Sequence, residues 1–213
     1  MTRPKNTREK LLDTAIDLIW KSNYTRVGVN EICKCAGVTK GGFYHYFETK
    51  ADLFYEASLH HWAQKQPELD EIFSPRYTPL QQLENLVAHI LDHQASDEGD
   101  DNPVLGCPFF TSGAQVGTGE DKVREASRIM CQNAIQYDLA LARGLKAGGY
   151  LNGDPDCEQV ARMMMQYIQG LLLFGRTYAD IDIVQKDIRE GLYRLLDLKA
   201  EYRVMPKPEE QAA

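Results

Sequence analysis

Apolar residues recur every three or four positions through most of the 213-residue chain, whereas the alternation typical of β-strands is nearly absent. The first apolar stripe follows Asn6 and Glu9, which have the spacing of a capping box at a helix start. Its members share one helical face: Leu11, Leu12, Ala15, Ile16, Leu18 and Ile19. The pattern predicts an all-α fold, with a first helix that ends at the segment "SNYTRVG".

Short helices follow this first one. We expect a second helix over residues 29–36, because Gly37 is a typical helix stop. A third helix over residues 40–46 would begin after Thr39, whose hydroxyl can cap its N-terminus. Thr49 opens a longer fourth helix in the same way. The first three helices therefore form a small N-terminal unit.

The rest of the chain carries longer helical patterns, separated by proline, glycine and acidic segments. We expect helices from Thr78 onwards, over residues 120–147, from Asp154-Pro155 through Phe174, and over residues 182–198. The segment "ASDEGDDNP" at 95–103 is an expected acidic loop. The predicted organisation is an N-terminal unit at residues 1–48, a helical bundle at residues 49–200 and a disordered tail at residues 201–213.

The turn "AGVT" joins the second and third helices, and a short glycine-containing turn between two helices is typical of a helix-turn-helix. In that motif the second helix enters the major groove of DNA, with its N-terminal residues toward the bases. Helical phase places Phe43, Tyr46 and Phe47 in the core and leaves Tyr44 and His45 exposed for DNA. An amphipathic hairpin that does not bind DNA is the alternative.

Charge is divided unevenly along the chain. The net charge of −7 argues against general affinity for nucleic acid, yet residues 1–54 hold nine Lys and Arg against six Asp and Glu. A basic head on an acidic body suits contact with DNA through the head alone. No apolar run approaches the roughly 18 residues of a membrane span, and the N-terminus lacks a signal sequence. We therefore expect a soluble cytoplasmic protein with no membrane partner.

The stretch "TREKLLDTAIDLIWKSNYTRVGVNEICKCAGVTKGGFYHYFETKADLF", about residues 7–54, resembles the DNA-binding domain of the TetR family of bacterial repressors. Its G-V-T-K-G-x-F-Y-H-Y-F-x-x-K portion is highly specific. The resemblance implies a homodimer that binds double-stranded operator DNA, and a C-terminal domain in which a small-molecule inducer releases the DNA. By position it implies DNA contacts from Thr39, Lys40, Gly41, Tyr44, His45 and Lys50. Val27 and Gly28 depart from the family, which usually has Thr and then Ser or Thr there.

Cys107 is the most distinctive residue of the C-terminal part. It precedes Pro108, and because proline favours the first position of a helix, the thiol should lie at a helix N-terminus, where free N–H groups lower the thiol pKa. Its Gly-Cys pair resembles one in several TetR-family members, some of which sense electrophiles or oxidants while others bind ligands non-covalently. A buried packing thiol is the competing interpretation, since acidic residues at 97–101 would raise the pKa.

Other candidate metal or disulfide residues carry weaker signals. The five cysteines are irregularly spaced, so we expect no disulfide framework. Cys33 and Cys35 would point about 200° apart on one helix, which suits packing rather than a shared metal. His89 and His93 have the four-residue spacing of a helical metal pair. Helical phase places His89 opposite the apolar stripe, however, so we expect a solvated His89, no metal and no cofactor.

Methionine and aromatic residues of the C-terminal helices are candidates to line a ligand cavity, because methionine adapts its shape and aromatic rings with a polar tip can orient a ligand. The candidate sensing residues are Cys107, Phe110, Met130, Tyr137, Met164 and Tyr167. The last two helices carry apolar stripes that suit a four-helix dimer interface of Ile168, Leu171, Leu172, Gly175, Ile188, Leu192 and Leu195. A monomer with these helices folded onto its own core is the alternative.

These features favour a ligand-responsive transcriptional regulator. We expect a repressor that binds a palindromic operator as a homodimer and is released by a small molecule or by modification of Cys107. A thiol-dependent enzyme, with Cys107 as nucleophile and His93 as base, is the second hypothesis. No Ser/Cys–His–acid pattern, phosphate loop or metal motif supports it, so we expect no enzymatic activity. A helical interaction module that does not bind DNA is the third.

Overall fold

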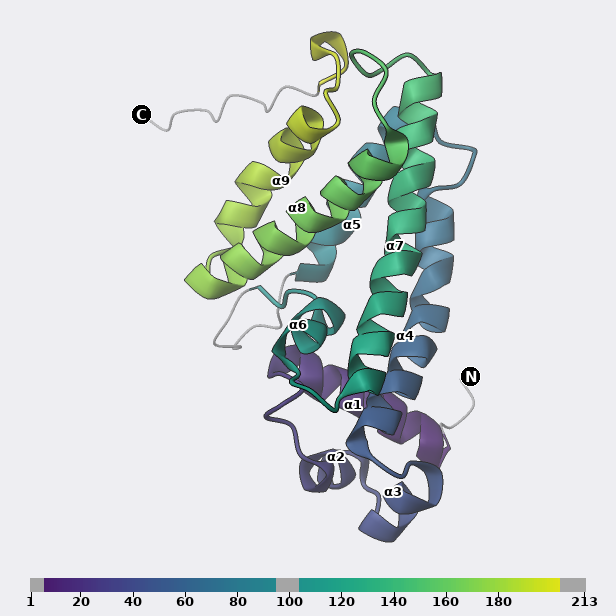
Figure 1. Cartoon of the computed structure of the whole chain (residues 1–213), viewed down its shortest axis with the longest axis vertical. Coiled ribbons are helices and arrows are strands. Elements are labelled where there is room, and N and C mark those ends of the chain that lie inside the picture. Colours follow the sequence, from purple (N-terminus) through teal and green to yellow (C-terminus); the bar gives the residue numbers. More distant parts are fainter. Residues whose placement is uncertain (1–5, 95–103, 204–213) are drawn as a thin grey trace.

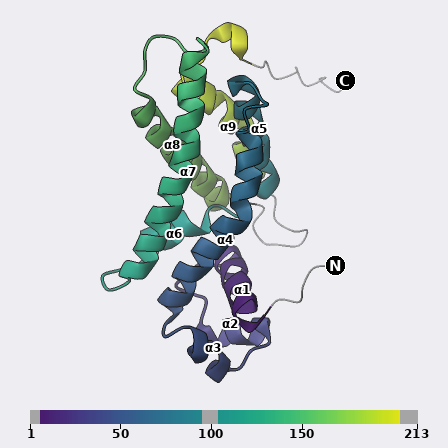
Figure 2. The same cartoon turned by 90° about the vertical axis from the view of Figure 1, so that its right-hand side faces the viewer.

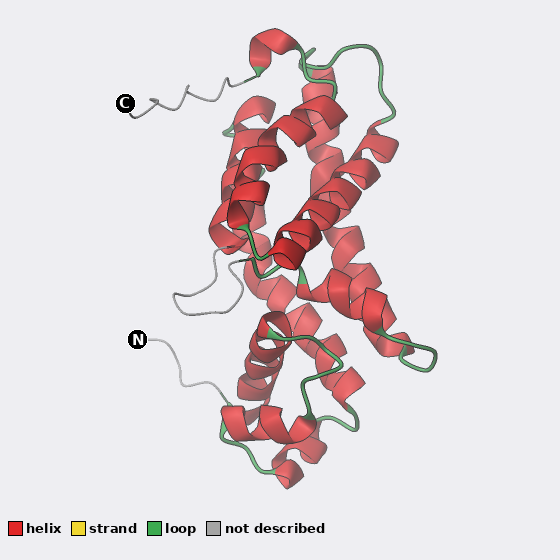
Figure 3. Cartoon of the chain, turned by 90° about the vertical axis from the view of Figure 1, so that its left-hand side faces the viewer, coloured by secondary structure: helices red, strands yellow, loops and turns green. Residues whose placement is uncertain are grey.

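The computed structural model describes residues 6–94 and 104–203, in which every regular element is a helix (Figure 3). Leu151 and Leu198 form an isolated bridge. The helices are α1 (Thr7–Lys21), α2 (Val29–Ala36), α3 (Lys40–Tyr46), α4 (Lys50–Ile72), α5 (Pro79–Gln94), α6 (Pro108–Gln115), α7 (Asp121–Ala147), α8 (Cys157–Tyr178), α9 (Ile181–Leu195) and the short 3₁₀ helix η1 (Ala200–Tyr202). The predicted all-α class is confirmed. No helix of the described ranges is long and apolar enough to cross a bilayer.

The short N-terminal helices begin and end where their capping residues predict. Asn6 and Glu9 form a reciprocal capping box at the start of α1, and a second capping box opens α4. The Thr39 hydroxyl accepts a hydrogen bond from the Gly42 N–H at 3.1 Å, which defines the start of α3. Gly37 ends α2 with a φ of 66°, a backbone conformation that favours glycine. Local signals therefore set these boundaries.

Helices α1 to α3 and the first turns of α4 enclose one apolar core. Phe43 and Phe47 are buried in it, as helical phase predicts. The same prediction for Tyr46 is wrong, because α3 ends at this residue and its ring, 42% exposed, packs beside His45. The core continues into α6 and α7 through residues such as Phe109. The N-terminal unit, which we call the head, therefore packs directly on the remaining helices.

Helices α5, α7, α8 and α9 form a bundle around a second core. Helices α4 and α7 run side by side from the head to this bundle (Figures 1 and 2). Helix α8 begins later than expected, since Asp156 rather than the Asp154-Pro155 pair caps it. Helix α9 ends at Leu195 instead of 198, where the chain turns to form the bridge to Leu151. The predicted acidic loop at 95–103 and the end of the predicted tail lie outside the described residues.

Candidate DNA-binding surface and internal cavity

Helix α3 lies at the end of the molecule away from the bundle, and its outer face is open to solvent (Figure 1). Lys40, Gly41, Tyr44 and His45 are exposed on this helix, and 58% of Tyr44 is accessible. Thr39 precedes them as the exposed N-cap. The structure thus brings five of the six predicted DNA contacts together on one short helix.

The two glycines at the start of α3 have different surroundings. A Cβ atom added at Gly41 would have only the Thr39 hydroxyl within 4 Å, at 3.9 Å, so this position is open. A Cβ atom at Gly42 would lie 2.8 Å from Cγ1 of Val38, which is closer than such atoms approach. Gly42 is therefore needed for the packing of α3 against the turn that follows α2, whereas Gly41 leaves space on the outer face.

Lys50, the sixth predicted contact, is engaged within the protein. Its ammonium donates to the carbonyl oxygens of Tyr24 at 2.8 Å and Val27 at 3.1 Å, and it lies 4.1 Å from the centre of the Tyr24 ring. Burial lowers the pKa of Lys50, and the nearby charge of Glu120 acts in the opposite direction. Lys50 thus ties the start of α4 to the segment between α1 and α2.

A set of hydrogen bonds fastens the end of α1 to the bundle. The indole N–H of Trp20 donates to the Gly106 carbonyl oxygen at 2.8 Å. The Arg176 guanidinium, on α8, donates to the carbonyl oxygens of Trp20 at 3.2 Å and Ser22 at 3.1 Å. It also donates to the Leu105 carbonyl oxygen. One side chain thus joins the last turn of α1, the segment before α6 and helix α8.

An internal cavity lies where these elements meet. It has two adjoining lobes of about 220 Å³ and 190 Å³, which together suit a small organic molecule. The lining that both lobes share is mostly apolar and includes Trp20, Leu69, Phe109, Ala134 and Met165. Gly106 lines the larger lobe beside Trp20. The cavity therefore borders the hydrogen bond that attaches α1 to the bundle.

The larger lobe contains one buried carboxyl group. Asp138 of α7 is only 5% exposed, and no hydrogen bond or ion pair within the described residues involves its carboxyl. Burial raises the pKa of Asp138 to about 7. The amide of Gln169, which lines both lobes, donates to the Met165 sulfur at 3.6 Å. A ligand with a hydrogen-bond donor or a positive charge would match the Asp138 carboxyl.

Cys107 caps α6 and lines both lobes, with Pro108 as the first helical residue, as the sequence predicts. Its Sγ accepts a hydrogen bond from the Phe110 N–H at 3.5 Å. The expected fall in thiol pKa is nevertheless wrong. Burial raises the pKa of Cys107 to about 11 and outweighs the lowering effect of the Phe110 and Phe109 N–H groups. The thiol is therefore protonated at neutral pH.

Three of the six candidate sensing residues line the cavity. Cys107 does so at the start of α6, and Met130 lines the smaller lobe from α7. The Tyr137 ring lines the larger lobe. Its hydroxyl, however, donates to an Asp70 carboxylate oxygen at 2.5 Å, so the polar tip that was expected to orient a ligand is already occupied.

The other three candidate sensing residues lie elsewhere. Phe110 is exposed, because α6 buries the neighbouring Phe109 instead. Met164 is fully buried in the bundle core, where it has no access to the cavity lobes. Tyr167 lies on the outer side of α8, and its hydroxyl donates to the Asp187 carbonyl oxygen at 2.6 Å. The periodicity of the sequence identifies the apolar faces of these helices, but it does not show which faces line the cavity.

Most of the predicted dimer interface is buried within one chain. The residues that already lie in the bundle are Ile168, Leu171, Leu172, Gly175, Ile188 and Leu192, and Leu195 is partly buried against them. These stripes therefore face the core of their own chain rather than a partner. The apolar residues that α8 leaves exposed lie on its other side: Met163, Leu173, Phe174 and Tyr178. A Cβ atom at Gly170 on that side would meet nothing within 4 Å.

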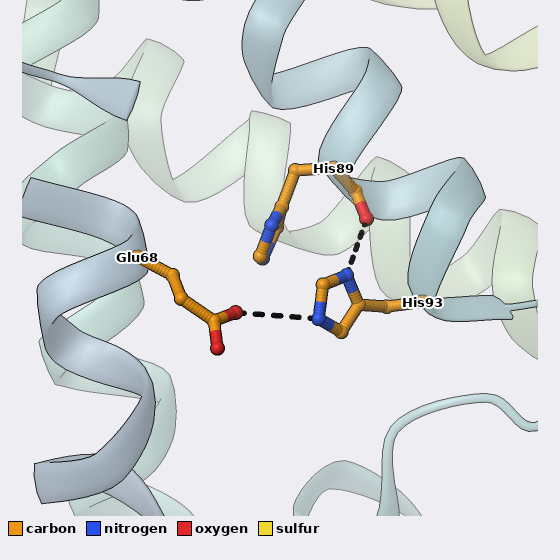
Figure 4. A group of neighbouring side chains, drawn as sticks. All are labelled: Glu68, His89 and His93. Atoms are coloured by element: carbon orange, nitrogen blue, oxygen red, sulfur yellow. Dashed lines mark hydrogen bonds and ion pairs between the residues drawn. The ribbon is translucent and has the colours of Figure 1, made fainter. Parts of the chain in front are cut away.

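His89 is partly buried rather than solvated as helical phase predicts. His89 and His93 both line the cavity, and their ring centres are 4.1 Å apart. Glu68 of α4 faces them (Figure 4). Burial is the main cause of the lowered pKa of His89, with a smaller effect from the charge of His93. The side of α5 that carries His89 thus lies beside α4, which the sequence does not show.

Comparison with known proteins is consistent with this arrangement. A family model described as "Bacterial regulatory proteins, tetR family" matches residues 11–57, which span α1 to the first turns of α4. The HTH-type transcriptional regulator AcrR of Shigella flexneri is 29% identical over 202 residues, which cover 91% of this chain and 89% of AcrR. This chain belongs to the TetR family. It is a transcriptional regulator with the DNA-binding helix-turn-helix of that family.

Solved structures have the same fold over nearly the whole chain. The reduced form of NemR from E. coli has a TM-score of 0.76 at 22% identity, and the match covers 92% of this chain and 100% of NemR. A cysteine mutant of the TetR-family regulator CifR, in complex with 26-bp double-strand operator DNA, has a TM-score of 0.72 at 19% identity. That match covers 92% of this chain and 98% of CifR. At these identities the likeness concerns the fold.

Sequence reasoning missed several residues around the cavity of this TetR-family chain. Asp138 has one usable signal, because it follows Ala134 by four residues and precedes Leu141 by three, on the buried stripe of α7. A carboxyl on such a stripe is expensive unless it has a function. Glu68 and Arg176 have no comparable signal, since only the packing of separate helices places them beside their partners.

Proposed function

We propose that this TetR-family regulator is a repressor that binds a palindromic operator as a homodimer and leaves it when a small molecule enters the internal cavity. The position of the cavity carries the proposal. Its wall includes Trp20 and Gly106, the two residues whose hydrogen bond attaches the end of α1 to the bundle. A ligand there would act on the contact that orients the head and so shift the population toward a released arrangement.

Helix α3 supplies the proposed contact with the major groove. Thr39 and Lys40 stand at its N-terminus, the end that faces base edges and nearby phosphates in a helix-turn-helix. Tyr44 and His45 add exposed hydrogen-bonding groups, and Gly41 leaves space for close approach. In a twofold dimer the two α3 helices would enter successive major grooves, which is why the operator should be palindromic.

The lining of the cavity indicates the chemistry of the inducer. Trp20 and Phe109 favour an aromatic or otherwise apolar molecule. The buried Asp138 carboxyl lacks a partner among the described residues, and it favours a ligand with a hydrogen-bond donor or a positive charge. We therefore expect the inducer to be an apolar cation or a neutral aromatic molecule with a hydrogen-bond donor.

Modification of Cys107 is the alternative signal. The raised pKa keeps the thiol protonated, which supports a non-covalent ligand over attack on an electrophile. The Cys107→Ser variant decides between them. If a modest excess of an electrophile releases DNA from the wild type and not from this variant, thiol modification is the signal. The same residue is a poor candidate nucleophile for a thiol-dependent enzyme.

The exposed side of α8 is the proposed dimer interface. The rings of Phe174 and Tyr178 pack against each other with their centres 4.5 Å apart, and Met163 and Leu173 extend the apolar surface. A groove of about 570 Å³ runs between the outer sides of α8 and α9 next to Phe174, and Gly170 opens into it. A helix of a second copy would fill this groove and cover the apolar residues beside it.

An operator-binding assay with DNA flanking the protein's own gene tests the proposal. The expected result is binding that falls steeply with salt, because phosphate contacts release counterions. Hydrophobic cations and neutral aromatic donors are then added as candidate inducers. Release by such a compound in the wild type, and weakened release in an Asp138→Leu variant that still binds DNA, would support the proposed cavity. Salt-independent binding, or release unaffected by Asp138→Leu, would contradict it.

A further inference from the structure

Glu68 lies beside His89 and His93, two residues of the cavity wall, away from the DNA-binding surface. Glu68 comes from α4, and the two histidines come from successive turns of α5. One potential ligand atom of each residue lies within 4.8 Å of those of the other two. Figure 4 shows the Glu68 carboxylate and the His93 ring pointing toward one another, with the His89 ring beside them. Two imidazoles and a carboxylate are a ligand set that zinc takes in three-residue sites.

Hydrogen bonding orients the His93 ring. Its Nδ1 lies 2.9 Å from the His89 carbonyl oxygen, and because a carbonyl oxygen only accepts, Nδ1 carries the proton. In the neutral ring Nε2 then keeps its lone pair, and this atom lies 3.3 Å from Oε2 of Glu68. Metal-ligating histidines are usually held in this way, with the second ring nitrogen bonded to a carbonyl or carboxylate oxygen.

A cation is already present beside these acceptors. The Lys65 ammonium lies 2.9 Å and 3.2 Å from the two Glu68 oxygens and 3.4 Å from Nε2 of His93. The Lys65 side chain is flexible and 36% exposed, so it can move into solvent. A metal ion that displaced it would meet the same acceptors, together with His89.

We propose that Glu68, His89 and His93 bind a divalent transition-metal ion, best matched by zinc, and that the Lys65 ammonium competes for this site. A bound ion would join α4 to α5 and so fix the long helix that begins in the head against the bundle. Three protein ligands leave a coordination position for water or for a donor atom of a molecule in the cavity. The metal site is inferred from the geometry of these residues alone, whereas any effect of the metal on operator affinity rests on the proposed function.

Calorimetric titration of the full chain with zinc chloride tests the site. We expect one zinc ion per chain. Glu68→Gln and His93→Gln should each weaken zinc binding by about tenfold or more, since even residues that only support metal ligands contribute this much to affinity. Lys65→Met should bind roughly tenfold more tightly, because a like charge is removed. His60→Ala is the matched control, a histidine on α4 that contacts Asp13 instead. Circular dichroism verifies that each variant is folded.

Wild-type zinc affinity in His93→Gln would overturn the proposal. So would the absence of zinc binding in both the wild type and Lys65→Met. Neither result depends on a variant that fails to fold. His93 is only partly buried, so His93→Gln should fold, and the other result compares the wild type with a variant at the partly exposed Lys65.

Cobalt separates this site from the cysteines of the cavity. Cys107 and Cys131 line the smaller lobe and are the competing donors. Imidazole and carboxylate ligands give cobalt(II) only weak d–d bands, whereas a thiolate adds strong charge-transfer absorption. We expect no charge-transfer band and full stoichiometry in a Cys107→Ser/Cys131→Ser variant. A charge-transfer band that disappears in this variant would assign the metal to the thiols and overturn the proposal.

Operator affinity with and without zinc then tests the regulatory consequence separately. A change in the wild type that is absent in His93→Gln would support control through α4. Zinc binding without any change in operator affinity would leave the metal site standing and remove its regulatory role. Failure of the protein to bind DNA both with and without zinc would instead contradict the proposed function.

Discussion

Tyr44 stands on the outer face of α3, 58% exposed, beside the buried Phe43 that anchors the helix. Because it is exposed, Tyr44→Ala should change stability by less than about 0.5 kcal/mol. The same change should weaken operator binding by roughly tenfold, as expected for loss of one DNA contact. Tyr46→Ala is the matched control, since that ring projects from another side of the same helix. Fluorescence anisotropy with labelled operator DNA measures the affinity. If Tyr44→Ala binds as tightly as the wild type, the outer face of α3 is not the DNA-binding face.

Lys50 offers a second test at the residue scale. Lys50→Met would leave the Tyr24 and Val27 carbonyl oxygens without their donor, so we expect a loss of about 1–2 kcal/mol in the free energy of unfolding. Weaker DNA binding would follow from the displaced start of α4. Lys40→Met, on the exposed start of α3, should lower DNA affinity without lowering stability. Urea unfolding measures the stability of both variants, and an operator-binding assay measures their DNA affinity. Unchanged stability with weaker DNA binding in Lys50→Met would restore the phosphate contact expected from the sequence.

The buried Asp138 carboxyl predicts a pH dependence of stability. Its pKa of about 7 in the folded protein exceeds the value of about 3.9 in an unfolded chain. Between these values the folded state holds a proton that the unfolded state has released, so stability falls from about pH 4 to about pH 7 and stays lower above it. Asp138→Asn should therefore be more stable than the wild type at pH 8, by roughly 1–3 kcal/mol, and similar at pH 4.

Urea unfolding at both pH values measures this difference, and Asp17→Asn, which changes an exposed carboxyl on α1, is the control. An equal effect of Asp138→Asn at pH 4 and pH 8 would show that the carboxyl does not titrate in this range. The physical cause would then be packing or hydrogen bonding of the new amide rather than removal of a buried charge.

At the scale of helices, local signals in the sequence were sufficient for most boundaries. Asn6, Thr39 and Gly37 act through hydrogen bonds or backbone geometry within one turn, so their effect is visible in a short segment. Faces were harder to assign, because periodicity shows that a stripe is apolar but not what covers it. The polar face of α5 that carries His89 lies beside Glu68 of α4, which is distant in the sequence.

The DNA-binding surface and the cavity differ in how far the sequence alone could predict them. The predicted DNA-binding surface belongs to one helix, so phase alone placed Tyr44 on the outside. The cavity takes its lining from five helices and the end of α1, and no single segment contains it. For Cys107 the local N-cap geometry was correct, but the pKa depends on burial by distant segments and moved in the opposite direction.

Arg176 provides the test of how elements are joined. Its guanidinium bonds carbonyl oxygens of α1 and of the segments after α1 and before α6, which a lysine cannot match with a single ammonium. Arg176→Lys should therefore loosen the head and lower operator affinity several-fold, by about 1 kcal/mol, while helix content stays constant. Arg162→Lys, at an exposed position of α8, is the control. Wild-type operator affinity in Arg176→Lys would remove this contact from the proposed signal route.

At the scale of the whole molecule, the proposed binding to a palindromic operator requires both the head and a dimer interface, for which we propose the outer side of α8. One head contacts one half-site, and a palindrome is read only when a second head is held at a fixed spacing of about one helical turn of DNA, roughly 34 Å. The head itself offers α3 to DNA, so the spacing must be set by the bundle. The exposed apolar side of α8, centred on Phe174 and Tyr178, is the surface suited to that role.

Phe174→Glu should therefore convert a dimer into a monomer, because a carboxylate would be buried at the centre of the interface. Light scattering should give the mass of two chains for the wild type and of one chain for the variant. Affinity for the full palindrome should fall by about a hundredfold or more, since the second half-site is no longer bound intramolecularly. Phe174→Leu keeps the apolar surface and should remain dimeric. A dimeric Phe174→Glu protein would place the interface elsewhere, whereas a monomeric wild type that still binds the palindrome tightly would contradict the dimer itself.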